Sequence, residues 1–238
     1  MIRSFLFDLY GTLVDIRTDE SMPCFWKRMA LFLSLQGAAY APEELHAAYI
    51  LAVAEQTERR SKERPTVIKA HIEPEIRYAF SALYTKKGVT ADPQTIQDTA
   101  LLFRTLSLRH IRLYPHAADV LRTLRERGHG VYLLSNAQAA FTMPELRKLG
   151  LLPLFDGIVL SSDVGVKKPD KTLFEHILSK YGLRPEACLM IGNDGDADIL
   201  GAAGVGMDSR YIHTKQSPER LKSLPDGCRE IFDLRELL

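Results

Sequence analysis

A short, largely apolar run near the N-terminus, Ile2 to Phe7, stops at Asp8 and is followed by a turn that contains Gly11. A run of this kind is typical of a strand buried on both faces, as in parallel sheets covered by helices. A further strand is expected at Arg210 to Ile212. Three more runs share the pattern of the first: Gly130 to Leu134, Gly157 to Leu160 and Ala187 to Ile191.

The stretches between these runs have the residue pattern of helices. They are Ala117 to Arg127, Pro144 to Leu149, Lys171 to Tyr181 and Asp198 to Ala203. Strands that alternate with helices at this spacing favour a parallel sheet with helices on both faces. The sequence therefore predicts an α/β fold whose core is a doubly wound, Rossmann-like parallel sheet.

The segment from Asp15 to Leu113 differs, because it has helical patterns and no convincing buried strand. Asp92 and Pro93 are typical of an N-cap followed by the first helical residue, and that helix is expected to continue toward His110. Other helices are expected within Met22 to Leu35, from Pro42 and from Pro74 to Lys87. We expect a smaller all-helical domain at residues 15–113, inserted into an α/β core formed by residues 1–14 and 114–238.

Composition excludes several classes of partner. The 31 Lys and Arg residues nearly balance the 30 Asp and Glu residues, so the net charge of +1 gives no reason to expect nucleic acid or an anionic membrane as a partner. Three widely separated cysteines do not indicate a disulfide framework, and no apolar stretch approaches the roughly 18 residues of a membrane span. We expect a cytoplasmic protein that acts on a small molecule, and the sequence gives no oligomeric state.

Polar residues follow the predicted strands at the points where those strands end. Asp8, Ser135 and Asp194 all hold such positions. In open α/β sheets, ligands bind beyond the carboxyl ends of the strands, so these three distant segments predict one site. A carboxylate there can attack phosphorus or an sp³ carbon and form a covalent intermediate, which makes Asp8 the candidate nucleophile.

The order and spacing of four motifs resemble those of the haloacid dehalogenase superfamily of hydrolases, whose cap-bearing members carry a helical insertion at the place of residues 15–113. The motifs are Asp8 to Leu13, Leu133 to Asn136, Lys168-Pro169, and Met190 to Asp194 with Asp198. The resemblance implies that Lys168 pairs with the Asp8 nucleophile and the transferring group. It also implies that substrate is bound by Tyr10, Thr12, the Ser135 hydroxyl, the Asn136 backbone N-H and Lys168.

The last motif indicates a metal site. Carboxylates crowded near Asp8 repel one another unless a cation lies between them, and magnesium is a hard cation that prefers oxygen ligands. By resemblance, Mg²⁺ is held by Asp8, by the Tyr10 backbone carbonyl and by Asp194. Asn193 and Asp198 are expected close to the metal without contacting it, and Asp196 is expected to face solvent.

The residue at position 10, Tyr10, distinguishes between the possible reactions. Phosphatases of this superfamily have an aspartate two residues after the nucleophile, which protonates the leaving group, and tyrosine with its ordinary pKa near ~10 is a poor substitute. True haloacid dehalogenases carry tyrosine there, but they dispense with metal and lack an acid at the position of Asp194. We favour a magnesium-dependent phosphatase acting on a small phosphorylated metabolite. The alternatives are a 2-haloacid dehalogenase and a non-catalytic binding protein on the same scaffold.

Overall fold

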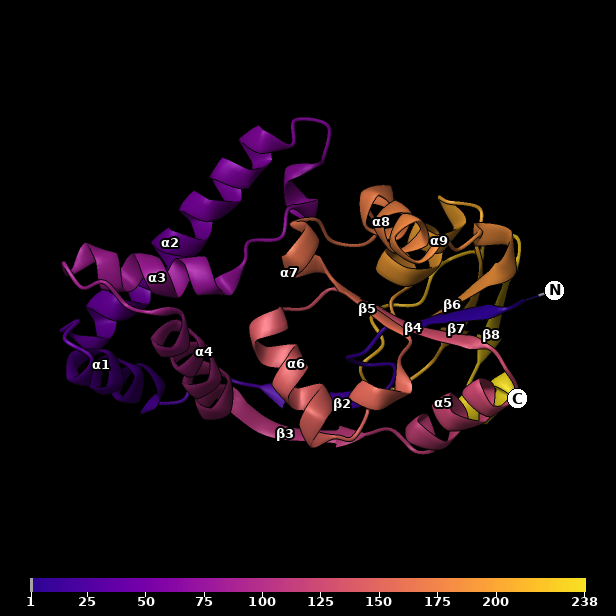
Figure 1. The fold of residues 1–238 in the computed structure, drawn as a ribbon, viewed down its shortest axis with the longest axis horizontal. Helices are drawn as coiled ribbons and strands as arrows, with labels where there is room; N and C mark the ends of the chain where they lie inside the picture. The colour runs from indigo at the N-terminus through magenta and orange to yellow at the C-terminus, as the bar shows by residue number, and fades with distance from the viewer. Residues whose placement is uncertain (1) are drawn as a thin grey trace.

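The computed structural model describes residues 2–238, and its centre is a six-stranded parallel sheet (Figure 1). The strand order is β5-β4-β1-β6-β7-β8, so the first strand of the chain lies inside the sheet between β4 and β6. The strands are β1 (Ser4–Phe7), β4 (Gly130–Ser135), β5 (Gly157–Leu160), β6 (Cys188–Gly192), β7 (Asp208–Ile212) and β8 (Cys228–Ile231). The expected doubly wound parallel sheet is confirmed.

Helices cover both faces of the sheet, and the alternation of side chains along β1 shows why. Phe5 and Phe7 pack in a cluster with residues of α5 and α6, whereas Leu6 packs in a cluster with residues of α8 and α9. Figure 1 shows these two pairs of helices on opposite sides of the sheet. Their bounds, with the short α7, are α5 (Ala117–Glu126), α6 (Ala139–Lys148), α7 (Ser161–Val164), α8 (Lys171–Tyr181) and α9 (Gly201–Ala203).

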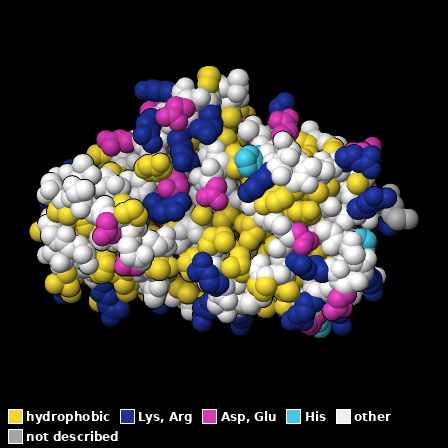
Figure 2. Space-filling model, viewed as in Figure 1, with side chains coloured by type: hydrophobic (Ala, Val, Ile, Leu, Met, Phe, Trp, Pro, Cys, Tyr) yellow, Lys and Arg dark blue, Asp and Glu magenta, His cyan; other side chains and the backbone are white. Residues whose placement is uncertain are grey.

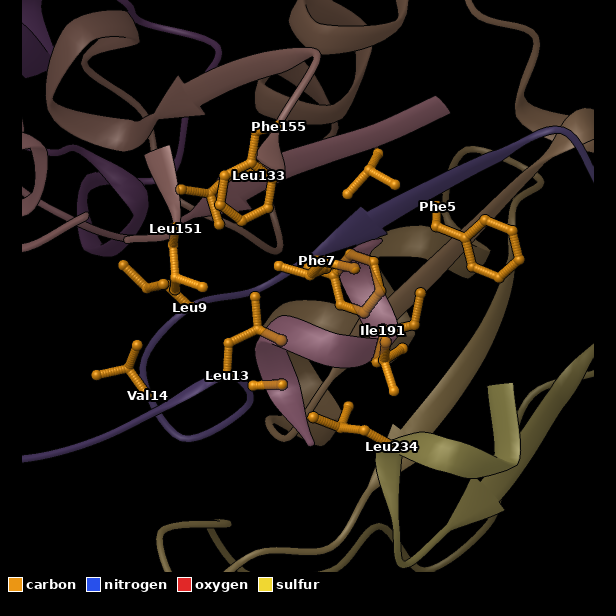
Figure 3. Packing of buried hydrophobic residues seen from close by; sticks show 14 of the residues in the cluster. Phe5, Phe7, Leu9, Leu13, Val14, Leu133, Leu151, Phe155, Ile191 and Leu234 are labelled. Carbon is orange, nitrogen blue, oxygen red and sulfur yellow. The ribbon is translucent and has the colours of Figure 1, made fainter. Parts of the chain in front are cut away.

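The turn that follows β1 is anchored in the same apolar cluster. Phe7, Leu9 and Leu13 are all at most 1% exposed, and Figure 3 shows them packed together with Ile191 of β6. Buried neighbours on both sides of Asp8 therefore fix the position of its backbone at the end of the strand.

The helical part of residues 15–113 has an apolar core of its own. It contains α1 (Phe25–Leu35), α2 (Pro42–Glu63), α3 (Ile76–Lys86) and α4 (Pro93–Ser107), with a short 3₁₀ turn, η1 (Lys69–His71), between α2 and α3. Its buried residues cluster with Ala140 and Phe141 of α6, which joins this core to the sheet domain. Figure 2 shows hydrophobic side chains gathered between the helical part on the left and the sheet domain on the right.

The expectation that residues 15–113 are entirely helical is wrong at both ends of the segment. Strands β2 (Val14–Thr18) and β3 (Leu108–Leu113) form an antiparallel two-stranded ribbon, with a register shift between Arg17 and Thr18. The helix that begins at Pro93 ends at Ser107, before His110. Both strands mix charged with apolar residues and have no continuous apolar run, which is why no buried-strand pattern indicated them.

Most other predicted elements are confirmed, with shifted bounds. Helix α6 begins at Ala139 and includes Pro144, where a later start was expected, and β8 was not predicted because Cys228–Ile231 holds two charged residues among four. After β6 the chain forms a π-helical turn, η4 (Gly195–Leu200), that leads into α9. No helix within residues 2–238 is long and apolar enough to cross a membrane.

Candidate active site

The sheet brings the distant sequence motifs to one edge. Asp8 directly follows β1, Ser135 ends β4, and Asn193 directly follows β6, and these three strands are neighbours. Lys168 lies in the loop before α8. With further residues they line a cavity of about 200 Å³ at the carboxyl ends of the strands. The lining includes Asp8, Tyr10, Ser135, Asn136, Lys168, Asn193, Asp194, Asp198, Gln216 and Pro218.

A buried lysine between two carboxylates forms the centre of the site. Lys168 Nζ lies 2.8 Å from Asp8 Oδ1 and 2.6 Å from Asp198 Oδ1, and it also donates to the Leu134 carbonyl at 2.8 Å. The side chains of Lys168 and Asp198 are each only 1% exposed. All three protons of the ammonium group therefore have acceptors, and its charge is matched by carboxylates on two sides.

The electrostatics of this cluster follow from its burial. Burial disfavours the charge on Lys168, but the Asp198 and Asp8 carboxylates outweigh that effect and raise the pKa of Lys168. The pKa of Asp198 is raised to about 7 by burial, against the attraction of Lys168 and with the repulsion of Asp8. Lys168 is therefore held as a fixed positive charge beside Asp8.

Two residues of the second motif organise Asp8 and Lys168. The Ser135 hydroxyl donates to Asp8 Oδ1 at 3.0 Å. The Asn136 side chain exchanges two hydrogen bonds with the backbone of Lys168, donating to its carbonyl at 3.0 Å and accepting from its N-H at 2.8 Å. The sequence indicated a role for the Asn136 backbone only, whereas the structure shows that its amide side chain fixes the loop that carries Lys168.

Asp198 has a more central position than the sequence indicated. Besides pairing with Lys168, it accepts a hydrogen bond from the Asp194 backbone N-H at 3.0 Å. A Cβ atom at Gly192 would lie 2.1 Å from Asp198 Oδ2, so only glycine allows the carboxylate to approach the strand. The residue that caps the following helical turn is Asp194, whose Oδ1 accepts from the Ala197 N-H at 2.9 Å.

The other predicted site residues divide between the cavity and the wall behind it. Asn193 lines the cavity, and its Oδ1 accepts from the buried Thr12 hydroxyl at 3.2 Å. Thr12 itself is not part of the cavity lining, so its side chain supports Asn193. Asp196 is exposed, as expected. Gln216 also lines the cavity and donates to Asp15 Oδ1 at 3.2 Å, but its segment has no motif that could have indicated this.

The Tyr10 hydroxyl is engaged by a buried ion pair that sequence reasoning missed. It donates to Glu145 Oε2 on α6 and lies 2.9 Å from the Thr142 hydroxyl. Arg104 of α4 donates from Nε to Glu145 Oε1 at 2.6 Å and lies over the Tyr10 ring, 5.5 Å from its centroid. Burial and the Glu145 charge raise the pKa of the Tyr10 phenol above its usual range. The phenol is therefore a poor proton donor to any leaving group.

The oxygen donors in the cavity fit a hard cation that keeps several water ligands. Within residues 2–238 no three acidic, histidine or cysteine side chains converge as a complete metal site. Asp8, Tyr10 and Asp194 nevertheless line the same small cavity, and Asp194 accepts the Ala197 N-H through one carboxylate oxygen, Oδ1. Two carboxylates and a backbone carbonyl, completed by water, form a donor set that suits Mg²⁺.

Comparison with known proteins identifies the family. Residues 2–206 match the haloacid dehalogenase-like hydrolases, and the chain belongs to this family. A solved 2-haloacid dehalogenase from Pseudomonas syringae superposes with a TM-score of 0.62 at 23% identity, covering 100% of this chain and 96% of that one. At this identity the likeness shows the shared fold and does not identify the reaction.

Two relatives of the chain are named as phosphatases. Glyceraldehyde 3-phosphate phosphatase from Methanothermobacter thermautotrophicus is 30% identical over 123 residues, which are 52% of this chain and 54% of that protein. Phosphoserine phosphatase from Thermus thermophilus is 33% identical over 129 residues, which are 54% of this chain and 51% of that protein. The match thus spans about half the length of each relative.

Proposed function

We propose that the protein is a magnesium-dependent phosphohydrolase that uses Asp8 as its nucleophile and acts on a small phosphorylated metabolite. The observation that carries this proposal is the arrangement around Asp8. Lys168 and Ser135 both contact Asp8 Oδ1, so Oδ2 remains available to attack a phosphorus atom placed in the cavity. The phosphatase names of the relatives support the same reaction.

The reaction proceeds in two displacements. Asp8 attacks phosphorus, the bond from phosphorus to the ester oxygen breaks, and the leaving group departs with that electron pair. Water then attacks the aspartyl phosphate, which releases inorganic phosphate and restores the carboxylate. Lys168 holds Asp8 ionised and offsets negative charge on the transferring group, and the Ser135 hydroxyl orients the carboxylate.

Asp8, the Tyr10 carbonyl and Asp194 are the proposed ligands of Mg²⁺. When bound, the cation neutralises charge between the carboxylate and the phosphoryl group, which is the main requirement of phosphoryl transfer. This role needs the backbone of Tyr10 and not its side chain. The hydrogen bond from the Tyr10 phenol to Glu145 is therefore compatible with metal binding at the Tyr10 carbonyl.

The first displacement has no carboxylic acid at position 10 to protonate the leaving group. Because the Tyr10 hydroxyl already donates to Glu145, we propose that the enzyme favours phosphates whose leaving groups depart without a proton, such as acyl and aryl phosphates. The helices of residues 15–113 would act as a cap that excludes water during the reaction. Their apolar core, which joins the sheet domain only at Ala140 and Phe141 among its buried residues, supports treating them as a domain.

Tyr10 also favours a second reaction, the hydrolysis of a 2-haloacid by attack of Asp8 on carbon. One screen separates the two reactions: acyl phosphates, aryl phosphates and 2-haloacids are each incubated with Mg²⁺ and with a chelator. We expect phosphate release that the chelator abolishes. Halide release that resists the chelator would instead establish the dehalogenase, and no turnover of any substrate would favour a non-catalytic binding protein.

A further inference from the structure

A second, larger cavity adjoins the candidate active site. Its volume is about 530 Å³, and it shares Asn136, Lys168 and Asp194 with the 200 Å³ cavity around Asp8. We call it the side cavity, and its own lining includes Ala70, His71, Lys167, Pro169, Asp196 and Leu200. With a phosphoryl group bound beside Asp8, the remainder of the substrate can extend into the side cavity, because the two cavities share lining residues.

Two basic residues from different parts of the chain line the side cavity. His71 belongs to η1 of the helical part, and Lys167 precedes Lys168 in the sheet domain. The Lys167 backbone N-H donates to the His71 carbonyl at 2.7 Å, and Ile72 forms an antiparallel bridge with Val166. Backbone pairing therefore holds the two side chains beside each other.

Lys167 carries a charge that the protein does not balance closely. Among residues 2–238 no carboxylate lies within ion-pair distance of its ammonium group, whereas the Lys168 charge is matched by Asp8 and Asp198. Glu73 is the buried acid near Lys167; burial raises its pKa, Lys167 opposes that rise, and its carboxylate accepts a hydrogen bond from Gln138.

His71 has a donor edge available. Its Nδ1 is buried, has no hydrogen-bond partner within the described chain and lies 3.7 Å from Asp170 Oδ2. The side chain is 24% exposed and lines the side cavity, so a part of it other than Nδ1 is open to the cavity. Of the two acids in the lining, Asp194 accepts the Ala197 N-H and Asp196 is exposed, and within residues 2–238 neither forms an ion pair with Lys167 or His71.

We propose that the side cavity is the leaving-group subsite and that Lys167 and His71 bind a second oxyanion, a carboxylate or a second phosphate, on the substrate. The inference rests on the proposed phosphatase function. It narrows the substrates to phosphorylated compounds that carry a second anionic group besides the phosphoryl group that is transferred. A charge-assisted hydrogen bond from Lys167 and a hydrogen bond from His71 would fix the leaving group while Asp8 attacks.

The test compares three aryl phosphates: 3-carboxyphenyl phosphate, its neutral analogue 3-carbamoylphenyl phosphate, and 1,3-phenylene bisphosphate. The first two are closely similar in shape, so the ratio of their kcat/KM values reports recognition of the carboxylate charge. We expect this ratio to be about 10 or more in the unmodified protein, as one charged hydrogen bond supplies. The bisphosphate shows whether a second phosphate is preferred to a carboxylate.

Variants assign the effect to the two residues. We expect Lys167→Met and His71→Gln each to lower the ratio at least about threefold, Lys167→Arg to retain it, and the control Lys171→Met to leave it unchanged. Lys171 is 71% exposed and faces Glu175 on α8. A ratio near one with all three substrates hydrolysed would overturn the subsite and leave the phosphatase standing. Absence of phosphate release from all three would overturn the phosphatase proposal and the subsite with it.

Discussion

Replacing Tyr10 by Phe removes one hydroxyl group and keeps the aromatic ring, and we expect this change to reduce stability much more than catalysis. The hydroxyl donates to the Glu145 carboxylate and contacts the Thr142 hydroxyl. A hydrogen bond to a charged group contributes about 1.5–3 kcal/mol and one between neutral groups about 1 kcal/mol. Arg104 still pairs with Glu145 in the variant, so the carboxylate is not left without a partner.

The expected loss is therefore near the lower end of the summed range, about 2.5 kcal/mol in the free energy of unfolding. Urea denaturation followed by circular dichroism measures it, with Tyr78→Phe as the matched control. Tyr78 is 55% exposed, and removing its hydroxyl should change the unfolding free energy by less than about 0.5 kcal/mol. For both variants, kcat with an aryl phosphate is measured on the folded protein.

The opposite pattern would refute this reasoning. If Tyr10→Phe keeps full stability but lowers kcat on aryl phosphates by about 100-fold, the phenol acts in the chemistry as a proton donor. That result would mean that the hydroxyl leaves Glu145 during turnover. Equal destabilisation by Tyr10→Phe and Tyr78→Phe would show that the link to Glu145 contributes nothing to folding.

Three other predictions test the site directly. Asp8→Asn should lower turnover by more than about 10³-fold, because an amide is a poor nucleophile, and steady-state kinetics measure this loss. The protein should stay folded, because the amide oxygen can still accept from Lys168, and thermal unfolding measures this. Asp194→Ala should weaken magnesium binding far more than Asp196→Ala, and equal affinities by calorimetry would contradict the proposed ligand set. Tyr10→Asp should raise activity on alkyl phosphates by up to roughly 10²-fold and leave aryl phosphates nearly unchanged. Similar rates on alkyl and aryl phosphates in the unmodified protein would show that another group already supplies the proton.

The sheet could be predicted from the sequence because each central strand carries its own signal. Short apolar runs such as Gly157 to Leu160 mark a buried strand without reference to any partner. Strand β8 has no such run, and its pairing with β7 depends on contacts that sequence does not reveal. Strands β2 and β3 were not predicted for the same reason. They have no continuous apolar run, and their pairing with each other stabilises them.

The site could be predicted only where a residue lies at the end of a strand or in a motif. Asp8 and Lys168 meet in the structure as the motifs indicated. Glu145 and Arg104 could not be found in this way, since each lies within a helix and acquires its role from a partner 41 residues away. The Asn136 amide was likewise unpredictable, because its two bonds to Lys168 depend on the path of a distant loop.

The β2–β3 ribbon carries both chain connections between the helical part and the sheet domain. The chain leaves the sheet domain along one strand and returns along the other, and the two strands are hydrogen-bonded together. Two hydrogen-bonded strands resist sliding and twisting more than two separate linkers would. The ribbon is most easily deformed at its register shift between Arg17 and Thr18. If the helical part moves about this ribbon, the backbone contact between His71 and Lys167 must open while the ribbon stays paired. Substitutions in the β2–β3 ribbon would then change the rates of substrate entry and product release without changing any residue around Asp8.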